Sequence, residues 1–219
     1  MHRLSTLLPL KDKLKIAIAT GESGKVAMVR AEFENTASVI EEALEDWQPE
    51  IPPDCALAKD PRGLPEDQAA ERARMQSILN NALAYRHSAF VYLYRTIYNH
   101  SRSHHMVQQH AHTSLIHCVG TTNNAGPMGA LLWPLFVAAC EAVGLDDRDL
   151  AKRAFKAIDR RQGMTNIERA WTIIQEVWRR ADELELSGSM QNHGEEQQSM
   201  VRDLWRKVTE DMGVTIVFG

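Results

Sequence analysis

The chain has 219 residues, of which 44% are hydrophobic and 25% charged, a composition typical of a globular protein rather than of a disordered or fibrous one. Its formal net charge of −4 argues against a protein that binds nucleic acid by itself, because phosphate contacts need a clustered basic surface. The three cysteines, Cys55, Cys118 and Cys140, lie far apart, which favours buried thiols in a reducing compartment over a disulfide framework or a zinc site.

No segment of the sequence has the pattern of a signal peptide or a membrane span. The apolar run near the N-terminus is broken by Pro9 and followed at once by lysines, so it is too short for the apolar core of a signal peptide. No other stretch approaches the roughly 20 apolar residues that a membrane helix needs. We therefore expect an intracellular protein that makes no contact with a membrane.

Two helices are predicted before residue 48. Apolar residues recur at helical spacing from Leu7 to Ile18, which predicts a short, one-sided helix that ends before Gly21. From Val26 to Trp47 they again recur every three or four positions, which predicts an amphipathic helix. Residues 48–66 carry five prolines and no periodicity, so we expect an irregular, Pro-rich connection there.

The rest of the chain is predicted to be helical as well. A long apolar face predicts a helix over residues 67–98, and a second pattern over residues 101–118 leads into a turn-rich segment. Shorter helices are expected over residues 150–158, 165–181 and 204–212, the last followed by a short, extended, apolar C-terminal tail. In total the pattern predicts seven or eight helices and no sheet.

Residues 131–143 form the helix around which the others are expected to pack. Glu141 is the only charged residue between Leu131 and Ala142, so this helix has no polar face to present to water. Pro134 is tolerated in its first turn, and Gly144 is predicted to end it as a left-handed C′ residue. We therefore predict an all-α, single-domain bundle over residues 1–219, in which the helices that contain Phe90 and Ile174 contact this central helix.

Four blocks recur in order in the second half of the chain: LLWPLFVAACEA followed by DDR, then NIERAW, EVWRRAD and LWRKVTEDMGVTIVFG. Together they resemble the C-terminal half of the fungal-specific transcription factor domain. In its family, this all-helical regulatory region follows a binuclear zinc cluster held by six cysteines. The likeness runs, with weaker stretches, from about Leu7 to Gly219. It implies an all-helical fold and a regulatory role in transcription.

One departure from the family bears on function. The zinc cluster needs six cysteines in paired short spacings near the N-terminus, and this chain has three that lie far apart. The leading hypothesis is therefore a non-catalytic regulatory, effector-sensing or protein-interaction domain, located in the nucleus, without its DNA-binding module. It implies a small apolar ligand, a protein partner or a second copy of the chain, and no direct contact with nucleic acid.

Two other hypotheses remain open at this point. The chain could be a stand-alone, cofactor-independent, cytoplasmic enzyme of isomerase or cyclase type that acts on an apolar metabolite in a pocket of the bundle. Alternatively, the sequence could come from a truncated gene model, in which case the sequence upstream of Met1 would restore the zinc cluster.

Histidine is the most conspicuous residue type, with seven of the nine lying between His87 and His117. Histidine binds metals and titrates near neutral pH, but HExxH is missing, and the pair His100 and His104 spans a predicted helix break. We therefore expect no bound metal, no other cofactor and a structural or surface role for most of these residues. His87 differs because it lies on the core face, either as a hydrogen-bonded core histidine or as a pocket residue.

Glu141 and Arg95 are the charges least expected from their apolar neighbours. A buried charge is costly unless it is paired, so we expect a structural ion pair between them, extended by Arg148 or Asp147. In the enzyme hypothesis, Glu141 and His112 would instead supply acid and base catalysis in an apolar cavity.

Aromatic residues suggest where a ligand could bind. The five tryptophans fall on helices with aliphatic companions, a pattern more typical of the core than of a site. Helical bundles nevertheless place small-molecule sites between facing helices, lined by aromatic side chains with a few polar anchors. For such a pocket we predict a lining of His87, Tyr94, Trp133 and Glu141.

Overall fold

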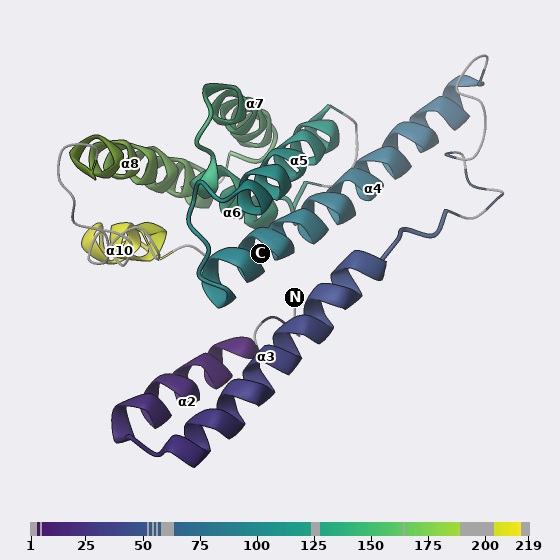
Figure 1. Cartoon of the computed structure of the whole chain (residues 1–219). Helices are drawn as coiled ribbons and strands as arrows, with labels where there is room; N and C mark the ends of the chain where they lie inside the picture. The colour runs from purple at the N-terminus through teal and green to yellow at the C-terminus, as the bar shows by residue number, and fades with distance from the viewer. Residues whose placement is uncertain are drawn as a thin grey trace.

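Every regular element in the described part of the structure is a helix (Figure 1). The computed structural model describes residues 4, 6–51, 53, 55, 57, 64–123, 128–163, 165–188 and 204–215. These residues form eight α-helices, one π-helical segment and no strand, so the predicted all-α fold is confirmed. The elements are α2 (Leu7–Thr20), α3 (Ser23–Asp46), α4 (Glu66–Tyr92), η2 (Leu93–Ile97), α5 (His105–Thr122), α6 (Leu132–Glu141), α7 (Leu145–Gln162), α8 (Thr165–Gly188) and α10 (Leu204–Asp211).

The predicted Pro-rich connection and the predicted extended C-terminal tail are described only in part. Between α3 and α4, the described part of residues 48–66 contains no α-helix before Glu66. Most of the predicted extended tail, residues 216–219, lies outside the described residues.

The helix predicted over residues 67–98 changes its hydrogen bonding near its end. After Tyr92, α4 continues as the π-helical segment η2, in which all five residues are buried. The N–H of Tyr98 donates to the carbonyl oxygen of Leu93 at 3.1 Å, the wider spacing of a π-helix. The segment is followed by Asn99, whose φ of 56° lies in the left-handed region that asparagine tolerates better than most residues. Such π-helical turns occur frequently at functional sites.

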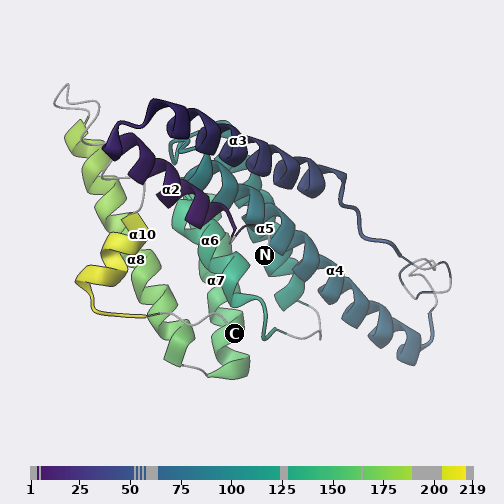
Figure 2. The ribbon, with the colours of Figure 1, turned by 90° about the horizontal axis from the view of Figure 1, so that it is seen from below.

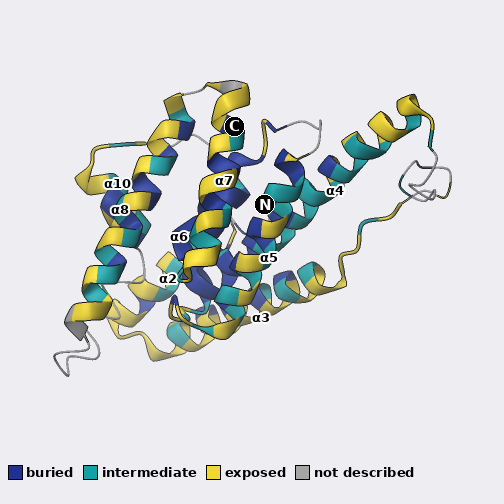
Figure 3. Ribbon diagram, turned by 90° about the horizontal axis from the view of Figure 1, so that it is seen from above, coloured by how far each residue is buried: buried dark blue, intermediate teal, exposed yellow. Residues whose placement is uncertain are grey.

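The buried apolar side chains form two clusters. The larger one joins α4, α5, α6, α7, α8 and α10, and includes Phe90 and Leu135. The smaller one joins α2 and α3 to the end of α4 and to η2, and includes Leu7. Leu44 and Tyr98 pack against both clusters. Figure 2 shows α2 and α3 lying along one side of the bundle, and Figure 3 shows exposed residues along their outer surfaces.

Helix α6 lies at the centre of the larger cluster. Eight of its ten residues are buried, which follows from the near absence of polar side chains in its sequence. Four helices pack around it, namely α4, α5, α7 and α8. These include the helices of Phe90 and Ile174, so the predicted central position of this segment is confirmed.

The C-terminal end of α6 differs from the prediction. Gly144 is not a left-handed C′ residue: its φ of −68° and ψ of 146° are extended, and it is the N-cap of α7. A left-handed glycine is not needed because side chains from elsewhere in the chain satisfy the terminal carbonyl groups. Trp178 Nε1 donates to Ala139 O at 2.7 Å, Gln108 Nε2 to Glu141 O at 2.8 Å, Arg102 Nη2 to Ala142 O at 2.5 Å, and Arg148 Nε to Ala142 O at 3.3 Å.

Helices α4 and α5 approach each other closely. A Cβ atom added to Gly120 would lie 2.6 Å from Asn80 Nδ2, so only glycine fits at this crossing without movement of its neighbour. Further along, the buried hydroxyl groups of Ser88 and Ser114 lie 2.8 Å apart, and Ser88 also donates to the carbonyl oxygen of Pro134 at 2.8 Å. This polar contact joins α4, α5 and α6 and satisfies groups that would otherwise be costly to bury.

Candidate functional site

Arg95 and Glu141 form a buried ion pair between η2 and α6. Arg95 Nε donates to Glu141 Oε2 at 2.8 Å, and the two side chains are only 7% and 10% exposed. Arg95 also donates to the carbonyl oxygen of His100, which holds the segment after η2 against the same site. The pairing matters because either charge alone would be costly at this depth.

Arg148, which was expected to extend this pair, has a different carboxylate partner. Its guanidinium binds both oxygens of Asp182 on α8, at 2.8 and 2.6 Å, and lies over the ring of Trp178 at 5.1 Å from its centroid. The hydrogen bonds from Arg148 lower the pKa of Asp182. Asp147 accepts a hydrogen bond from His112. Arg148 and Asp147 therefore join α7 to α8 and to α5.

A small cavity lies beside the ion pair. Its volume is about 70 Å³, room for little more than two water molecules. It is lined by Val91, Tyr92, Arg95, Thr96, Trp133, Phe136, Val137, Cys140, Glu141 and Trp205. Two of the four residues predicted to line a pocket, Trp133 and Glu141, thus lie together on its wall.

The other two residues of the predicted lining lie elsewhere. Tyr94 donates its hydroxyl to Glu41 Oε1 at 2.9 Å, and Tyr98 donates to the other oxygen at 2.7 Å, so both tyrosines bind η2 and its end to α3. His87 contacts histidines of α5. The structure therefore does not bring His87, Tyr94, Trp133 and Glu141 into one lining, because His87 and Tyr94 pack on His110 of α5 instead.

The acid and base residues of the enzyme hypothesis also lie apart. The side chain of His112 is 51% exposed, and its Nδ1 lies 2.6 Å from Asp147 Oδ1. It is not among the residues that line the cavity beside Glu141. The geometry accordingly gives Glu141 an arginine partner rather than a histidine partner.

Three half-buried histidines meet where α4 packs on α5. His87 Nδ1 lies 2.8 Å from His110 Nδ1, and the ring of His87 stacks on that of His117 at 5.9 Å between centroids. Burial lowers the pKa of His87 to about 4, assisted by His110, Arg86 and His117. Burial and the charge of Arg86 likewise lower the pKa of His110 to about 4. No group of three or more His, Cys, Asp or Glu among the described residues is arranged to hold a metal ion.

The histidine pair predicts a pH-dependent stability. A histidine whose pKa is near 4 in the fold and near 6.5 in the unfolded chain takes up a proton on unfolding between these pH values. Stability from the neutral pair is therefore present above pH 6.5 and is lost as the pH falls toward 4. Urea unfolding at several pH values gives the free energy of unfolding as a function of pH. Between pH 4 and 6.5 this free energy should change less steeply with pH in His87→Gln than in the wild type. An equal pH dependence in the two proteins would contradict this prediction.

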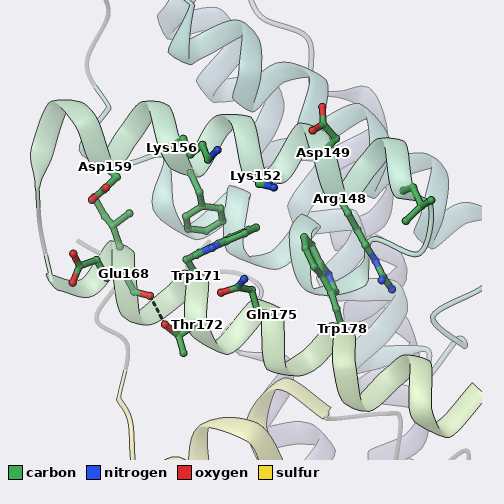
Figure 4. Close-up of a pocket in the computed structure, with 13 residues that line it drawn as sticks. Arg148, Asp149, Lys152, Lys156, Asp159, Glu168, Trp171, Thr172, Gln175 and Trp178 are labelled. Atoms are coloured by element: carbon green, nitrogen blue, oxygen red, sulfur yellow. Dashed lines mark hydrogen bonds between the residues drawn. The ribbon is translucent and has the colours of Figure 1, made fainter.

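An open trough with a volume of about 640 Å³ runs between α7 and α8 (Figure 4). Its wall on α8 carries Trp171 and Trp178, whose rings meet edge to face with centroids 5.5 Å apart. Phe155 of α7 contacts Trp171, with 5.3 Å between ring centroids. The complete lining is Leu145, Arg148, Asp149, Lys152, Phe155, Lys156, Asp159, Ile167, Glu168, Trp171, Thr172, Gln175 and Trp178.

The rim of this trough carries charges of both signs. Lys152 and Lys156 lie one turn apart on α7, and Figure 4 shows both above the ring of Trp171. Among the described residues, neither lysine forms an ion pair. Asp159 and Glu168 lie at the end of the trough where α7 connects to α8.

The sequence did not predict this trough, because the helical spacing of the tryptophans is more typical of core residues. None of the five is fully buried, and Trp171 and Trp178 are half-buried in the trough. Ala170 and Val177, each one position earlier, point into the core instead. The signal was present in the sequence, because adjacent apolar residues at both positions widen the helix face beyond one stripe.

Comparison with known proteins identifies the family of this chain. Residues 25–219 match the model of the fungal-specific transcription factor domain. Neither the curated proteins nor the solved structures provide a match. None of the described helices is long and apolar enough to cross a membrane. Because the match covers most of the chain, in agreement with the resemblance noted in the four sequence blocks, the protein belongs to the family of the fungal-specific transcription factor domain.

Proposed function

We propose that this protein is a non-catalytic regulatory domain of a fungal transcription regulator and acts in the nucleus by binding another molecule. The family match over residues 25–219 supports the regulatory role, and the contacts of Glu141 argue against the enzyme hypothesis. The carboxylate of Glu141 is paired with Arg95, its backbone carbonyl is bound by Gln108, and its side chain is only 10% exposed. A carboxylate held in this way stabilises the contact between η2 and α6 and is poorly placed to move a proton.

The sizes and linings of the cavities favour binding between α7 and α8. Ligand sites usually measure about 300 to 1,000 Å³ and are lined by aromatic side chains. The cavity beside Glu141, at about 70 Å³, is too small for an apolar metabolite. The trough between α7 and α8, at about 640 Å³, and two hollows beside α10, at about 480 and 530 Å³, fall in this range, and of these three the trough has the most aromatic residues in its lining. We therefore assign the binding event to the trough and a structural role to Glu141.

A tethering experiment tests the regulatory role. The full chain is fused to an unrelated, sequence-specific DNA-binding module in a fungal host that carries a reporter gene with the matching sites. Transcription of the reporter should differ between the fusion and the module alone. The variant Leu135→Asp, which places an unpaired carboxylate in the main core and prevents folding, should lose the effect when compared at equal protein level, because regulation requires the folded domain. An intact, nuclear fusion that leaves transcription unchanged would contradict the proposal.

A further inference from the structure

Helix α8 has one broad apolar face. Ile174 and Val177 pack into the main core. Trp171 and Trp178 lie at the edge of this face, where they pack against the same cluster, are half-buried and line the trough. Partly exposed tryptophans in a concave surface are typical anchors for a bound molecule, because they offer a large contact area with few rotatable bonds.

The charges beside these rings favour an acidic partner. Lys152 and Lys156 project from α7 at positions i and i+4, are exposed, and have no ion pair among the residues that the structure describes. The other cation of the lining, Arg148, is bound to Asp182. The middle of the trough therefore presents two lysines without ion pairs next to an aromatic floor. The carboxylates of the lining are Asp149, which is paired with Arg153, and Asp159 and Glu168 at one end.

The shape of the trough favours a helix over a compact small molecule. On α7 its lining extends from Leu145 to Asp159, a length of about 21 Å at the rise of an α-helix. A small-molecule site encloses most of its ligand, whereas this trough is open to solvent. An amphipathic helix can lie in such a groove with its apolar side inward, as in other helix-in-groove interactions.

We propose that the trough between α7 and α8 binds an acidic amphipathic helix of a partner protein. Apolar residues of that helix contact Trp171 and Trp178, and its carboxylates pair with Lys152 and Lys156. This inference rests on the proposed regulatory function and names the class of partner. The direction of binding follows from Asp159 and Glu168, because the positive N-terminal end of the docked helix is favoured beside these carboxylates.

Designed peptides test the proposal on the full chain. The first probe is a 14-residue helix-forming peptide, about 21 Å long, with leucines at positions i, i+4 and i+7 and glutamates beside them. The second replaces its glutamates by lysines, and the third replaces its leucines by alanines. Calorimetric titration should show that the acidic amphipathic peptide binds best, and that added salt weakens its binding.

Matched charge reversals locate the site. The double variant Lys152→Glu/Lys156→Glu should weaken binding of the acidic peptide by about tenfold or more, since two favourable contacts become repulsive. Lys13→Glu/Arg30→Glu is the control: it makes the same change in net charge on exposed positions of α2 and α3 that do not line the trough. The single variant Trp171→Ala should weaken binding without reversing the preference for acidic peptides. Melting temperatures establish that all variants remain folded.

Several outcomes would overturn the proposal. Absence of binding by the acidic peptide, equal binding of the three peptides, or equal effects of the two double variants would each do so. Self-association of the chain that Lys152→Glu/Lys156→Glu abolishes would identify a second copy as the occupant instead. The tethering experiment separates the two proposals: a fusion that regulates the reporter equally well with this double variant would refute the acidic helix while leaving the regulatory function intact.

Discussion

Replacing Leu135 by alanine is expected to lower the free energy of unfolding by about 4 kcal/mol. Leu135 is fully buried in the middle of α6, among helices packed on several sides of it. The substitution removes buried apolar atoms and leaves a cavity that the surrounding helices cannot fill without moving. Urea unfolding followed by circular dichroism measures the change.

Leu186→Ala is the matched control for this experiment. Leu186 is also helical, but it is 72% exposed, so its truncation should change stability by no more than about 0.5 kcal/mol. If the two variants lost similar amounts of stability, α6 would not be the centre of the core.

Glu141→Gln is expected to cost about 3 kcal/mol of stability. Glutamine has nearly the same shape and keeps one oxygen that can accept from Arg95, but it carries no charge. The substitution therefore removes the carboxylate charge that pairs with the buried guanidinium of Arg95. For a chain of this length the loss corresponds to a decrease in melting temperature of about 6 to 12 °C.

Asp12→Asn controls for the removal of one negative charge. Asp12 lies 3.8 Å from Lys15, and the two side chains are 70% and 69% exposed, so this substitution should leave the melting temperature nearly unchanged. If Glu141→Gln also melted like the wild type, Glu141 would have no structural role. The hypothesis of an enzyme that uses this carboxylate would then become the stronger one.

The helices could be predicted from the sequence because each depends mainly on the spacing of its own apolar residues. The position of α6 followed from a single property, its lack of polar residues. The end of α6 could not be predicted, because the donors that replace a glycine cap come from Gln108 and Trp178, which are distant in sequence. The π-helical turn at η2 leaves no comparable signal in the spacing of apolar residues.

Of the contacts at the candidate site, only the ion pair of Arg95 with Glu141 could be predicted from the sequence. Arg95 and Glu141 are lone charges in apolar helical segments, so a contact between them followed from the cost of burying either alone. Arg148 pairs with Asp182 because of how α7 and α8 are rotated against each other, which the sequence does not show. The meeting of His87 with His110 depends in the same way on the relative shift of α4 and α5.

The small second core has a consequence for how the molecule opens. Helices α2 and α3 are held to η2 by their own apolar cluster, by Tyr94 and Tyr98 on Glu41, and by Lys11 on the carbonyl oxygen of Thr96. Few side chains join these contacts to the larger cluster: Leu44 and Tyr98 pack against both clusters, and Tyr94 belongs to the larger one. We therefore expect a partly unfolded state in which this hairpin is detached, reached at a lower free energy than global unfolding. Amide hydrogens of α2 should exchange with solvent through that state, whereas those of α6 should exchange only when the whole bundle unfolds.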